Sequence, residues 1–187
     1  MVVMKLVLIR HCETDWNAAG RMQGQTDTLL NETGRQQALM LCDHLEPLGI
    51  TLAYSSDLKR AVETAQIISL RLGIPVRTDK RLRECHFGSL EGMTSREASA
   101  HYSKPNFYPL DIKFYTNEKD FYDFTSYGGE SKKEVVRRHL EFLDDMRKNH
   151  AEETVLVIGH GTSLNTLLAM FGQDPTLQRG ELRFLEM

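Results

Sequence analysis

Short apolar runs alternate with longer segments of helical period along this chain, and that alternation constrains the fold more than any other feature. Strand-like apolar runs cover residues 2–9, 51–55, 75–78 and 154–158. Segments with apolar residues at helical spacing begin near Thr33, Asp57, Glu130 and Thr162. Strands that alternate with helices are typical of α/β proteins, in which helices cover both faces of a parallel sheet. We therefore expect a three-layer α/β/α sandwich with a largely parallel sheet.

Two of the predicted helices begin with side chains typical of helix N-termini. Thr33, with Gln36 three positions later, resembles a capping box, in which the two side chains bond the first backbone N–H groups of a helix. Asp57 precedes the next helical segment and is expected to be its N-cap.

The chain is expected to form one domain, residues 1–187, because 187 residues are enough to bury a single sizeable core. Within it, residues 94–127 are rich in tyrosine and phenylalanine and lack a clear period. A segment of that kind in a compact domain is typical of a lid or a substrate-binding excursion. A small helical subdomain that packs for stability fits the same composition. We expect a lid-like insertion on the substrate side and keep the second interpretation open.

Net charge and cysteine content exclude several classes of protein. A formal net charge of -3 gives no basic surface for nucleic acid and no polybasic segment for anionic lipid. No apolar run approaches the roughly 18 residues of a membrane helix. The three cysteines (Cys12, Cys42 and Cys85) are an odd number without metal-type spacing, which is typical of free thiols in a reducing cytosol. We therefore expect a cytoplasmic protein that binds neither nucleic acid nor membrane.

Charged and polar residues follow each predicted strand at the point where the strand ends. They are Arg10 and His11 after the first strand, Arg60 after the second, Arg81, Arg83 and Glu84 after the third, and His160 between two glycines after the fourth. Ligands of doubly wound sheets bind at the carboxyl ends of the strands, so we expect these side chains to share one site.

This set of side chains fits phosphoryl transfer. Two guanidinium groups can hold a phosphate dianion through bidentate hydrogen bonds. A neutral imidazole can attack phosphorus and form a phosphohistidine that water then hydrolyses. Because arginines and a second histidine can stabilise the transferred charge, we expect neither a metal nor another cofactor.

A carboxylic acid is also needed, because the leaving alcohol must be protonated. On chemistry alone, the candidates for this acid are Glu84, Glu91 and Glu130. Glu84 could instead form a surface ion pair with Arg81 or Arg83. The residues themselves leave this assignment open.

A second Arg-His pair, Arg138-His139, lies inside the helix that begins near Glu130. The charged residues that flank it are Lys132, Lys133, Glu134, Arg137 and Glu141. A pair surrounded by charge on an amphipathic helix is typical of a solvated face. We therefore expect Arg138 and His139 to face solvent.

The run RHCET at residues 10–14 resembles the signature of the histidine phosphatase (phosphoglycerate mutase-like) superfamily, and it continues through Trp16-Asn17 and Gln23-Gly24. Further matching stretches, in family order over nearly the whole chain, are residues 30–34, 54–65, 82–84, 87–88, 91–92, 128–131 and 159–161. The resemblance is to the phosphatase branch, with its alpha-ribazole and broad-specificity phosphatases.

The resemblance also implies roles for individual residues. It implies that His11 is the phosphorylated nucleophile and that Glu84 is the proton donor. The implied phosphate clamp consists of Arg10, Arg60 and His160. Further substrate contacts are implied for Asn17, Gln23, Gly24 and the backbone at Gly161.

Two features depart from the family pattern. Cys12 stands where the family usually has glycine, and a positive φ there would make the cysteine cost on the order of 1 kcal/mol. Its thiol is either a tolerated small side chain or a group sensitive to oxidation. Relatives commonly continue into a further strand past Leu185, whereas this chain stops at Met187, so we expect a shortened chain or a missing edge strand.

The residues and the resemblance together favour a metal-independent phosphomonoesterase that acts on a small phosphorylated metabolite. A cofactor-dependent phosphoglycerate mutase is the alternative, although the mutases that the chain resembles are longer. A catalytically silent module that binds a phosphorylated ligand is a third interpretation, and the presence of the expected catalytic residues disfavours it. The physiological ester and the oligomeric state, a dimer included, remain open.

Overall fold

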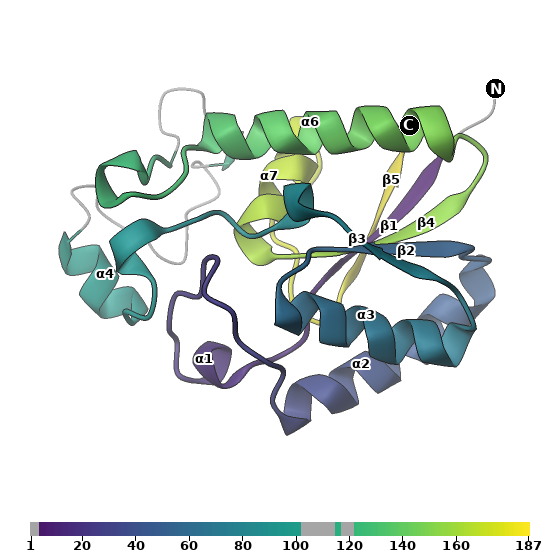
Figure 1. The fold of residues 1–187 in the computed structure, drawn as a ribbon, viewed down its shortest axis with the longest axis horizontal. Helices are drawn as coiled ribbons and strands as arrows, with labels where there is room; N and C mark the ends of the chain where they lie inside the picture. Colours follow the sequence, from purple (N-terminus) through teal and green to yellow (C-terminus); the bar gives the residue numbers. More distant parts are fainter. Residues whose placement is uncertain (1–3, 102–114, 117–121) are drawn as a thin grey trace.

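The centre of the molecule is a five-stranded sheet in the order β3-β2-β4-β1-β5 (Figure 1). The computed structural model describes residues 4–101, 115–116 and 122–187. The strands are β1 (Lys5–Arg10), β2 (Leu52–Ser55), β3 (Val76–Thr78), β4 (Thr154–Gly159) and β5 (Leu182–Glu186). The first four pair in parallel, and β5 pairs antiparallel with β1. The sequence-based prediction of an α/β fold with a largely parallel sheet is confirmed.

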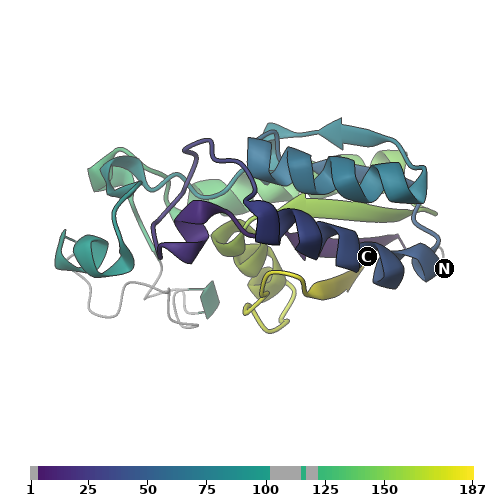
Figure 2. The ribbon, with the colours of Figure 1, turned by 90° about the horizontal axis from the view of Figure 1, so that it is seen from below.

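Helices cover both faces of this sheet, which gives the predicted three layers (Figures 1 and 2). One face packs against α2 (Glu32–Leu45) and α3 (Lys59–Leu72), and the other against α6 (Lys132–Asn149) and α7 (Gly161–Met170). Successive side chains of β1 alternate between the two apolar clusters, because neighbouring residues of a strand point to opposite faces. Because both faces of β1 are buried, a shift of its pairing by one residue would exchange the two sets of core side chains. The register of β1 is therefore fixed.

Two expected helix N-caps are corrected by the structure. The N-cap of α2 is Asn31, whose side chain accepts a hydrogen bond from the Gly34 N–H, so Thr33 lies inside the first turn. The N-cap of α3 is Leu58, which makes no side-chain cap bond. Asp57 instead holds the Arg83 guanidinium through bonds of 2.6 and 2.7 Å. The Asp57 carboxylate is thus bound to the Arg83 guanidinium and does not cap α3.

Residues Leu182–Glu186 form β5, for which the sequence analysis assigns no strand. This strand lies at the edge of the sheet, and Leu185 is its one buried residue. The other four residues of β5 are partly or fully exposed, so the sequence has no continuous apolar run to reveal the strand. The described end of the chain returns to its start, since Met4 and Met187 exchange two backbone hydrogen bonds.

The described parts of the segment 94–127 lie outside the sandwich, near the carboxyl ends of the strands (Figure 1). Its described parts include α4 (Ser95–His101) and the 3-10 turn η4 (Thr125–Tyr127). Tyr115, Tyr122 and Phe124 pack into a third apolar cluster with residues of the 85–90 region. The remainder of the expected insertion, residues 102–114 and 117–121, lies outside the described residues.

The expectation that Arg138 and His139 face solvent is wrong. The side chain of His139 is fully buried, and that of Arg138 is only 12% exposed. Both follow Val135 and precede Phe142 on the buried side of α6, since residues three and four positions apart share a helix face. Of the flanking charged residues, Lys133, Glu134, Arg137 and Glu141 are exposed, whereas Lys132 is partly buried and donates to the Tyr115 carbonyl. No helix in the described part of the chain is long and apolar enough to span a membrane.

The buried His139 should make the protein sensitive to acid. Its Nδ1 donates to the Val135 carbonyl at 2.8 Å, and burial, with Arg138 nearby, lowers its pKa to about 3. In an unfolded chain the pKa of this histidine is about 6.5. Between about pH 6.5 and pH 3, the unfolded state therefore binds a proton at His139 that the folded state does not bind. The contribution of neutral His139 to the free energy of unfolding is therefore fully present above about pH 6.5. It decreases as the pH falls toward about 3, by at most about 1.4 kcal/mol per pH unit.

We therefore expect a His139→Leu variant to lose less stability than the wild type between about pH 6.5 and pH 4. Urea unfolding at several pH values measures the slope in both proteins. The other buried histidines are common to the two and cancel in the difference. Equal slopes would contradict the assignment of acid sensitivity to His139.

Candidate active site

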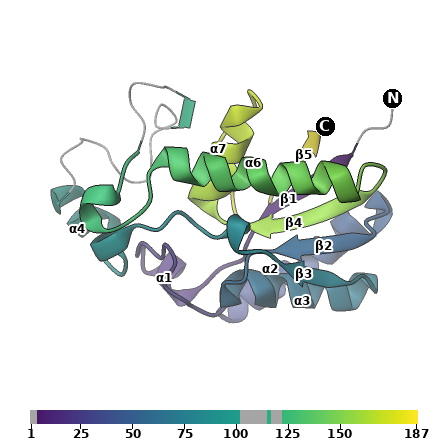
Figure 3. The same ribbon diagram turned by 45° about the horizontal axis from the view of Figure 1, so that its top comes forward.

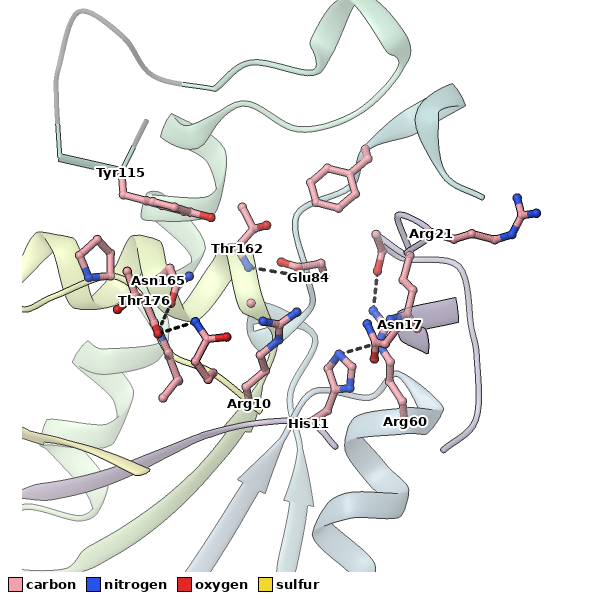
Figure 4. A pocket seen from close by; sticks show the side chains of 17 residues that line it. Arg10, His11, Asn17, Arg21, Arg60, Glu84, Tyr115, Thr162, Asn165 and Thr176 are labelled. Carbon is pink, nitrogen blue, oxygen red and sulfur yellow. Dashed lines mark hydrogen bonds between the residues drawn. The ribbon is translucent and has the colours of Figure 1, made fainter. Parts of the chain in front are cut away.

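A pocket of about 310 Å³ opens at the carboxyl ends of β1, β2 and β4 (Figure 4). Eight residues named by the sequence analysis line it: Arg10, His11, Asn17, Gln23, Gly24, Arg60, Glu84 and Gly161. Tyr115, from the segment 94–127 expected on the substrate side, also lines the pocket. The sequence analysis assigned no site role to the remaining lining residues: Arg21, Phe87, Thr162, Asn165 and the loop residues 175–178. Most of these come from loops or from helix faces beyond the strand ends, where no apolar-to-charged break in the sequence marks them.

His11 follows the last residue of β1 and is almost completely buried. Its Nδ1 lies 2.7 Å from the Cys12 carbonyl, which can only accept, so Nδ1 carries the proton. Nε2 therefore has a lone pair, and it accepts a bond from Arg60 Nε at 3.3 Å. Burial, followed by the charges of Arg60 and Arg10, holds the pKa of His11 well below its usual value. The imidazole is thus neutral and presents a single unprotonated nitrogen.

Arg60, in the first turn of α3, is completely buried. Its Nη1 donates to the Thr26 carbonyl at 2.8 Å and its Nη2 to the Gly24 carbonyl at 2.6 Å. Burial lowers its pKa to about 10, so the guanidinium remains charged at neutral pH. Gly24 has a φ of 52°, and a side chain there would collide with the Glu91 carboxylate. Glycine at this position therefore permits the loop that receives Arg60.

Arg10 ends β1 and lies against the first residue of α7. A Cβ added to Gly161 would be 2.8 Å from Arg10 Cζ, so a larger residue there would push the guanidinium out of its present position. Within the described residues the buried Nε of Arg10 has no hydrogen-bond partner. Buried polar groups are normally paired, and an anion in the pocket would supply the missing acceptor.

His160 lies beside His11, with ring centroids 5.0 Å apart and ring planes at 55°. It is fully buried, and neither ring nitrogen has a partner among the described residues. Burial, followed by the charge of Arg60, keeps its pKa well below the usual value. Unlike the other expected clamp residues, His160 is not part of the pocket wall. It packs against the nucleophile candidate as a second neutral ring.

Asn17 and Gln23 are oriented by threonine hydroxyls. Oδ1 of Asn17 accepts from the backbone N–H and hydroxyl of Thr14, which caps the short helix α1 (Asp15–Ala18). Oε1 of Gln23 accepts from the Thr28 hydroxyl and shares with Asn17 Oδ1 the single proton of the Thr14 hydroxyl. With both oxygens occupied, the NH2 groups are the ends that an anion in the pocket can use.

Glu84 is 7% exposed and shares the pocket with the arginines and His11 (Figure 4). Its carboxylate accepts from the backbone N–H groups of Cys85, Thr162 and Ser163 at 2.9–3.1 Å. It makes no ion pair with the neighbouring arginines: Arg81 binds Asp79 and Asp145, and Arg83 binds Asp57. The interpretation of Glu84 as a surface ion-pair residue does not hold.

The two competing carboxylates are used elsewhere. Glu91 accepts bonds from the backbone of Gln25, Thr26 and Phe87, and so joins the loop that carries Gln23 and Gly24 to the segment after Glu84. Glu130 accepts from the His86 N–H at 2.9 Å. Neither belongs to the pocket wall. Of the three acids left open by sequence chemistry, Glu84 alone lines the pocket.

Cys12 is completely buried in the apolar cluster between the sheet and α2 and α3. Its N–H donates to the Thr64 hydroxyl at 3.2 Å, and burial raises the pKa of its thiol to about 11. The thiol is therefore protonated at neutral pH. Because oxidation proceeds through an exposed thiolate, the interpretation of Cys12 as a tolerated small side chain fits the structure better.

An unprotonated imidazole nitrogen, two guanidiniums and a carboxyl group in one pocket at the edge of an α/β sheet define a site suited to phosphoryl transfer. The sequence model of the histidine phosphatase superfamily (branch 1) matches residues 6–182, and the chain belongs to this family. Among the described residues, no group of three or more histidine, cysteine or acidic side chains is arranged to hold a metal ion.

The relatives include proteins named as phosphatases and as mutases. The chain is 37% identical over 170 residues to a metal-independent phosphoserine phosphatase of Arabidopsis thaliana, covering 88% of this chain and 67% of the relative. It is 35% identical over 171 residues to a probable phosphoglycerate mutase of Erwinia tasmaniensis, covering 89% and 74%. A solved mycobacterial glucosyl-3-phosphoglycerate phosphatase, in complex with VO3, superposes with a TM-score of 0.80 at 31% identity, covering 97% and 92%.

We expect His11 to stay neutral in the free protein as the pH falls from 8 to about 5.5, because its pKa lies well below the usual 6.5. Nitrogen-15 NMR of labelled histidine should show a protonated Nδ1 and an unprotonated Nε2 throughout that range. A His11→Gln variant identifies the signals. Conversion of His11 to the doubly protonated form near pH 6.5 would contradict the prediction.

Proposed function

We propose that the protein is a phosphatase that hydrolyses a small phosphate ester through a phosphohistidine on His11. The single observation that supports this most is the lone pair of His11 Nε2, fixed by the Cys12 carbonyl beside Arg60 in a pocket that also contains Glu84. Family membership supports phosphatase activity in general terms. The proposal goes beyond family membership in three respects: the phosphohistidine intermediate, the roles of individual residues and the class of substrate.

The phosphate dianion binds between Arg10 and Arg60. Arg10 Nε, buried without a partner among the described residues, gains an acceptor when the anion enters. The NH2 ends of Asn17 and Gln23 complete the donor set. His160 packs against the nucleophile as a neutral ring, so it adds no further positive charge beside the imidazole of His11. This assembly supplies charge stabilisation for an oxyanion.

Reaction occurs in two displacements at phosphorus. In the first, the Nε2 lone pair forms a P–N bond, the bond from phosphorus to the ester oxygen breaks, and protonated Glu84 gives its proton to that oxygen. In the second, the ionised Glu84 takes a proton from water, the water oxygen bonds to phosphorus, and the P–N bond breaks. Inorganic phosphate leaves, and Glu84 is again protonated.

The substrate is a small phosphorylated metabolite, because a pocket of about 310 Å³ accommodates a phosphate group together with a small alcohol portion. Beyond the phosphate site the wall is mixed in character. Arg21 lies on one side, and Tyr115 and Asn165 on the other, linked by a side-chain hydrogen bond. These residues are the ones expected to contact the alcohol portion of the ester.

We expect His11→Ala to abolish hydrolysis of p-nitrophenyl phosphate, and Glu84→Gln to lower kcat by roughly 10²–10⁴-fold on an alkyl phosphate. Activity should persist in EDTA. Rapid quenching into base, which preserves phosphohistidine, followed by peptide mass spectrometry should locate the phosphoryl group on His11. A loss below tenfold in a folded His11 or Glu84 variant would refute the role of that residue. Loss of activity in the chelator would refute the metal-independent reaction.

Phosphoglycerate mutase activity is the second candidate, supported by the relative named as a probable mutase. A mutase must retain the bisphosphate intermediate and return a phosphoryl group to it instead of to water. Interconversion of phosphoglycerates after priming with bisphosphoglycerate, measured against release of inorganic phosphate, distinguishes the two. Absence of both turnover and phosphorylated His11 would instead identify a module that binds phosphorylated ligands without catalysis.

A further inference from the structure

Glu84 belongs to an irregular stretch of backbone that needs external support. The 3-10 turn η2 (Lys80–Leu82) ends just before it, and the next such turn, η3 (Gly88–Leu90), begins four residues later. Backbone carbonyls in such a segment have no ladder or helix to bond with, yet buried ones must be paired. In this segment one side chain, Arg138 of α6, donates to three of these carbonyls.

The guanidinium of Arg138 is fully committed to this segment and to Glu130. Nη1 donates to the carbonyls of Arg81 and Arg83, both at 2.6 Å. Nη2 donates to the Glu84 carbonyl at 3.1 Å and to Glu130 Oε2 at 3.2 Å. Nε donates to Glu130 Oε1 at 3.1 Å. All five N–H donors of the arginine therefore have acceptors.

Glu130 extends this support to the residues after Glu84. Its Oε2 accepts from the His86 N–H at 2.9 Å and from Gln25 Nε2 at 3.4 Å. Gln25 Nε2 also lies 3.2 Å from the Glu84 carbonyl. The backbone on both sides of Glu84 is thus tied to one ion pair, Arg138–Glu130, whose side chains are 12% and 21% exposed.

The helix that carries Arg138 is a rigid base for these contacts. Ser131 and Glu134 form a capping box at its start, and Val135, His139 and Phe142 are buried on the same side. α6 packs directly against η2, and both views in Figures 1 and 3 show the helix running over this segment. The carboxylate of Glu84 is held by α7, while its backbone is held by α6.

We propose that Arg138 is a positioning residue for the general acid and base Glu84, an inference that rests on the phosphatase function proposed above. Arg138 does not line the pocket and contacts no reacting atom. It acts by fixing the Glu84 main chain, because a catalytic group must be held to within about 0.5 Å of its productive position. A misplacement of about 1 Å can cost roughly 10²-fold in rate.

The leaving group of the substrate separates this role from general support of the fold. Phenyl phosphate has a poor leaving group that needs a proton, whereas 2,4-dinitrophenyl phosphate releases an anion that does not. Glu84→Gln should lower kcat/KM strongly for phenyl phosphate and little for the dinitrophenyl ester. Arg138→Met should show the same selective loss, at least about tenfold on phenyl phosphate, with a smaller change on the other ester.

The second displacement gives an independent measurement. With the dinitrophenyl ester a displaced Glu84 still permits phosphorylation of His11 but activates water poorly. Phosphohistidine should therefore accumulate in Arg138→Met after a rapid quench into base, as in Glu84→Gln. Arg138→Lys should behave like Arg138→Met, because a single ammonium group cannot reproduce a planar set of donors to three carbonyls and a carboxylate.

Matched controls come from two neighbouring arginines. Arg137→Met removes an exposed charge from the adjacent position of α6. Arg81→Met removes the Arg81 side chain, which joins η2 to α6 through Asp145 and the Glu141 carbonyl but does not contact Glu84. Both should leave the leaving-group dependence unchanged, even if Arg81→Met lowers the melting temperature.

The outcomes separate the two proposals. If Glu84→Gln itself shows no leaving-group dependence, the function proposed for Glu84 fails. If Glu84→Gln shows it and folded Arg138→Met loses equal activity on both esters, or none, Arg138 has only a structural role and the positioning inference is overturned. Full recovery in Arg138→Lys would also overturn it, because charge and not geometry would then be responsible. Selective loss in both Arg138 variants supports the inference.

Discussion

The buried guanidinium of Arg60 is the interaction on which the rest of the site depends. A charged side chain that is buried away from solvent destabilises the fold unless its donors have hydrogen-bond acceptors. The acceptors of Arg60 are the carbonyls of Gly24 and Thr26 and the imidazole of His11. Its donors fix the conformation of the loop at Gly24 and the position of His11 at the same time. Because no carboxylate bonds directly to Arg60 in the described structure, its charge remains effective within the pocket, and it lowers the pKa of both His11 and His160.

Of three glutamates near the pocket, one lines it and two support the loops around it. Glu91 and Glu130 accept backbone N–H groups from loops on either side, whereas Glu84 lines the pocket. The carboxylates of Glu91 and Glu130 link segments that lie far apart in the sequence. The loops around the pocket are therefore joined to each other by side-chain hydrogen bonds. The sheet supplies only Arg10 and the position of His11. Most of the precision in the site therefore comes from side-chain bonds to the main chain.

The sequence predicts the part of this architecture that follows from periodicity. Apolar runs located the four parallel strands, and the break from apolar to charged residues after Ile9 located Arg10 and His11. β5 was missed because an exposed edge strand buries too little to show a pattern. Asp57 was assigned as a cap because local sequence does not reveal that Arg83 reaches it.

Arg138 shows a further limit of local sequence. Its neighbours in the chain are charged, but its helical neighbours at three and four residues, Val135 and Phe142, are buried. A helical-period analysis of that stretch would have placed it toward the core. What no periodicity could have shown is its set of acceptors, since the carbonyls of residues 81–84 bond to whatever donor the tertiary structure brings to them.

The hydrogen bond between His11 and the main chain of residue 12 has a consequence for sequence variation. The proton on Nδ1 is held by a carbonyl, a group that every amino acid possesses, so the tautomer of His11 does not depend on the identity of the side chain at position 12. That side chain has only to fit a closed apolar space. The position after His11 can therefore hold different small residues without changing which imidazole nitrogen carries the proton.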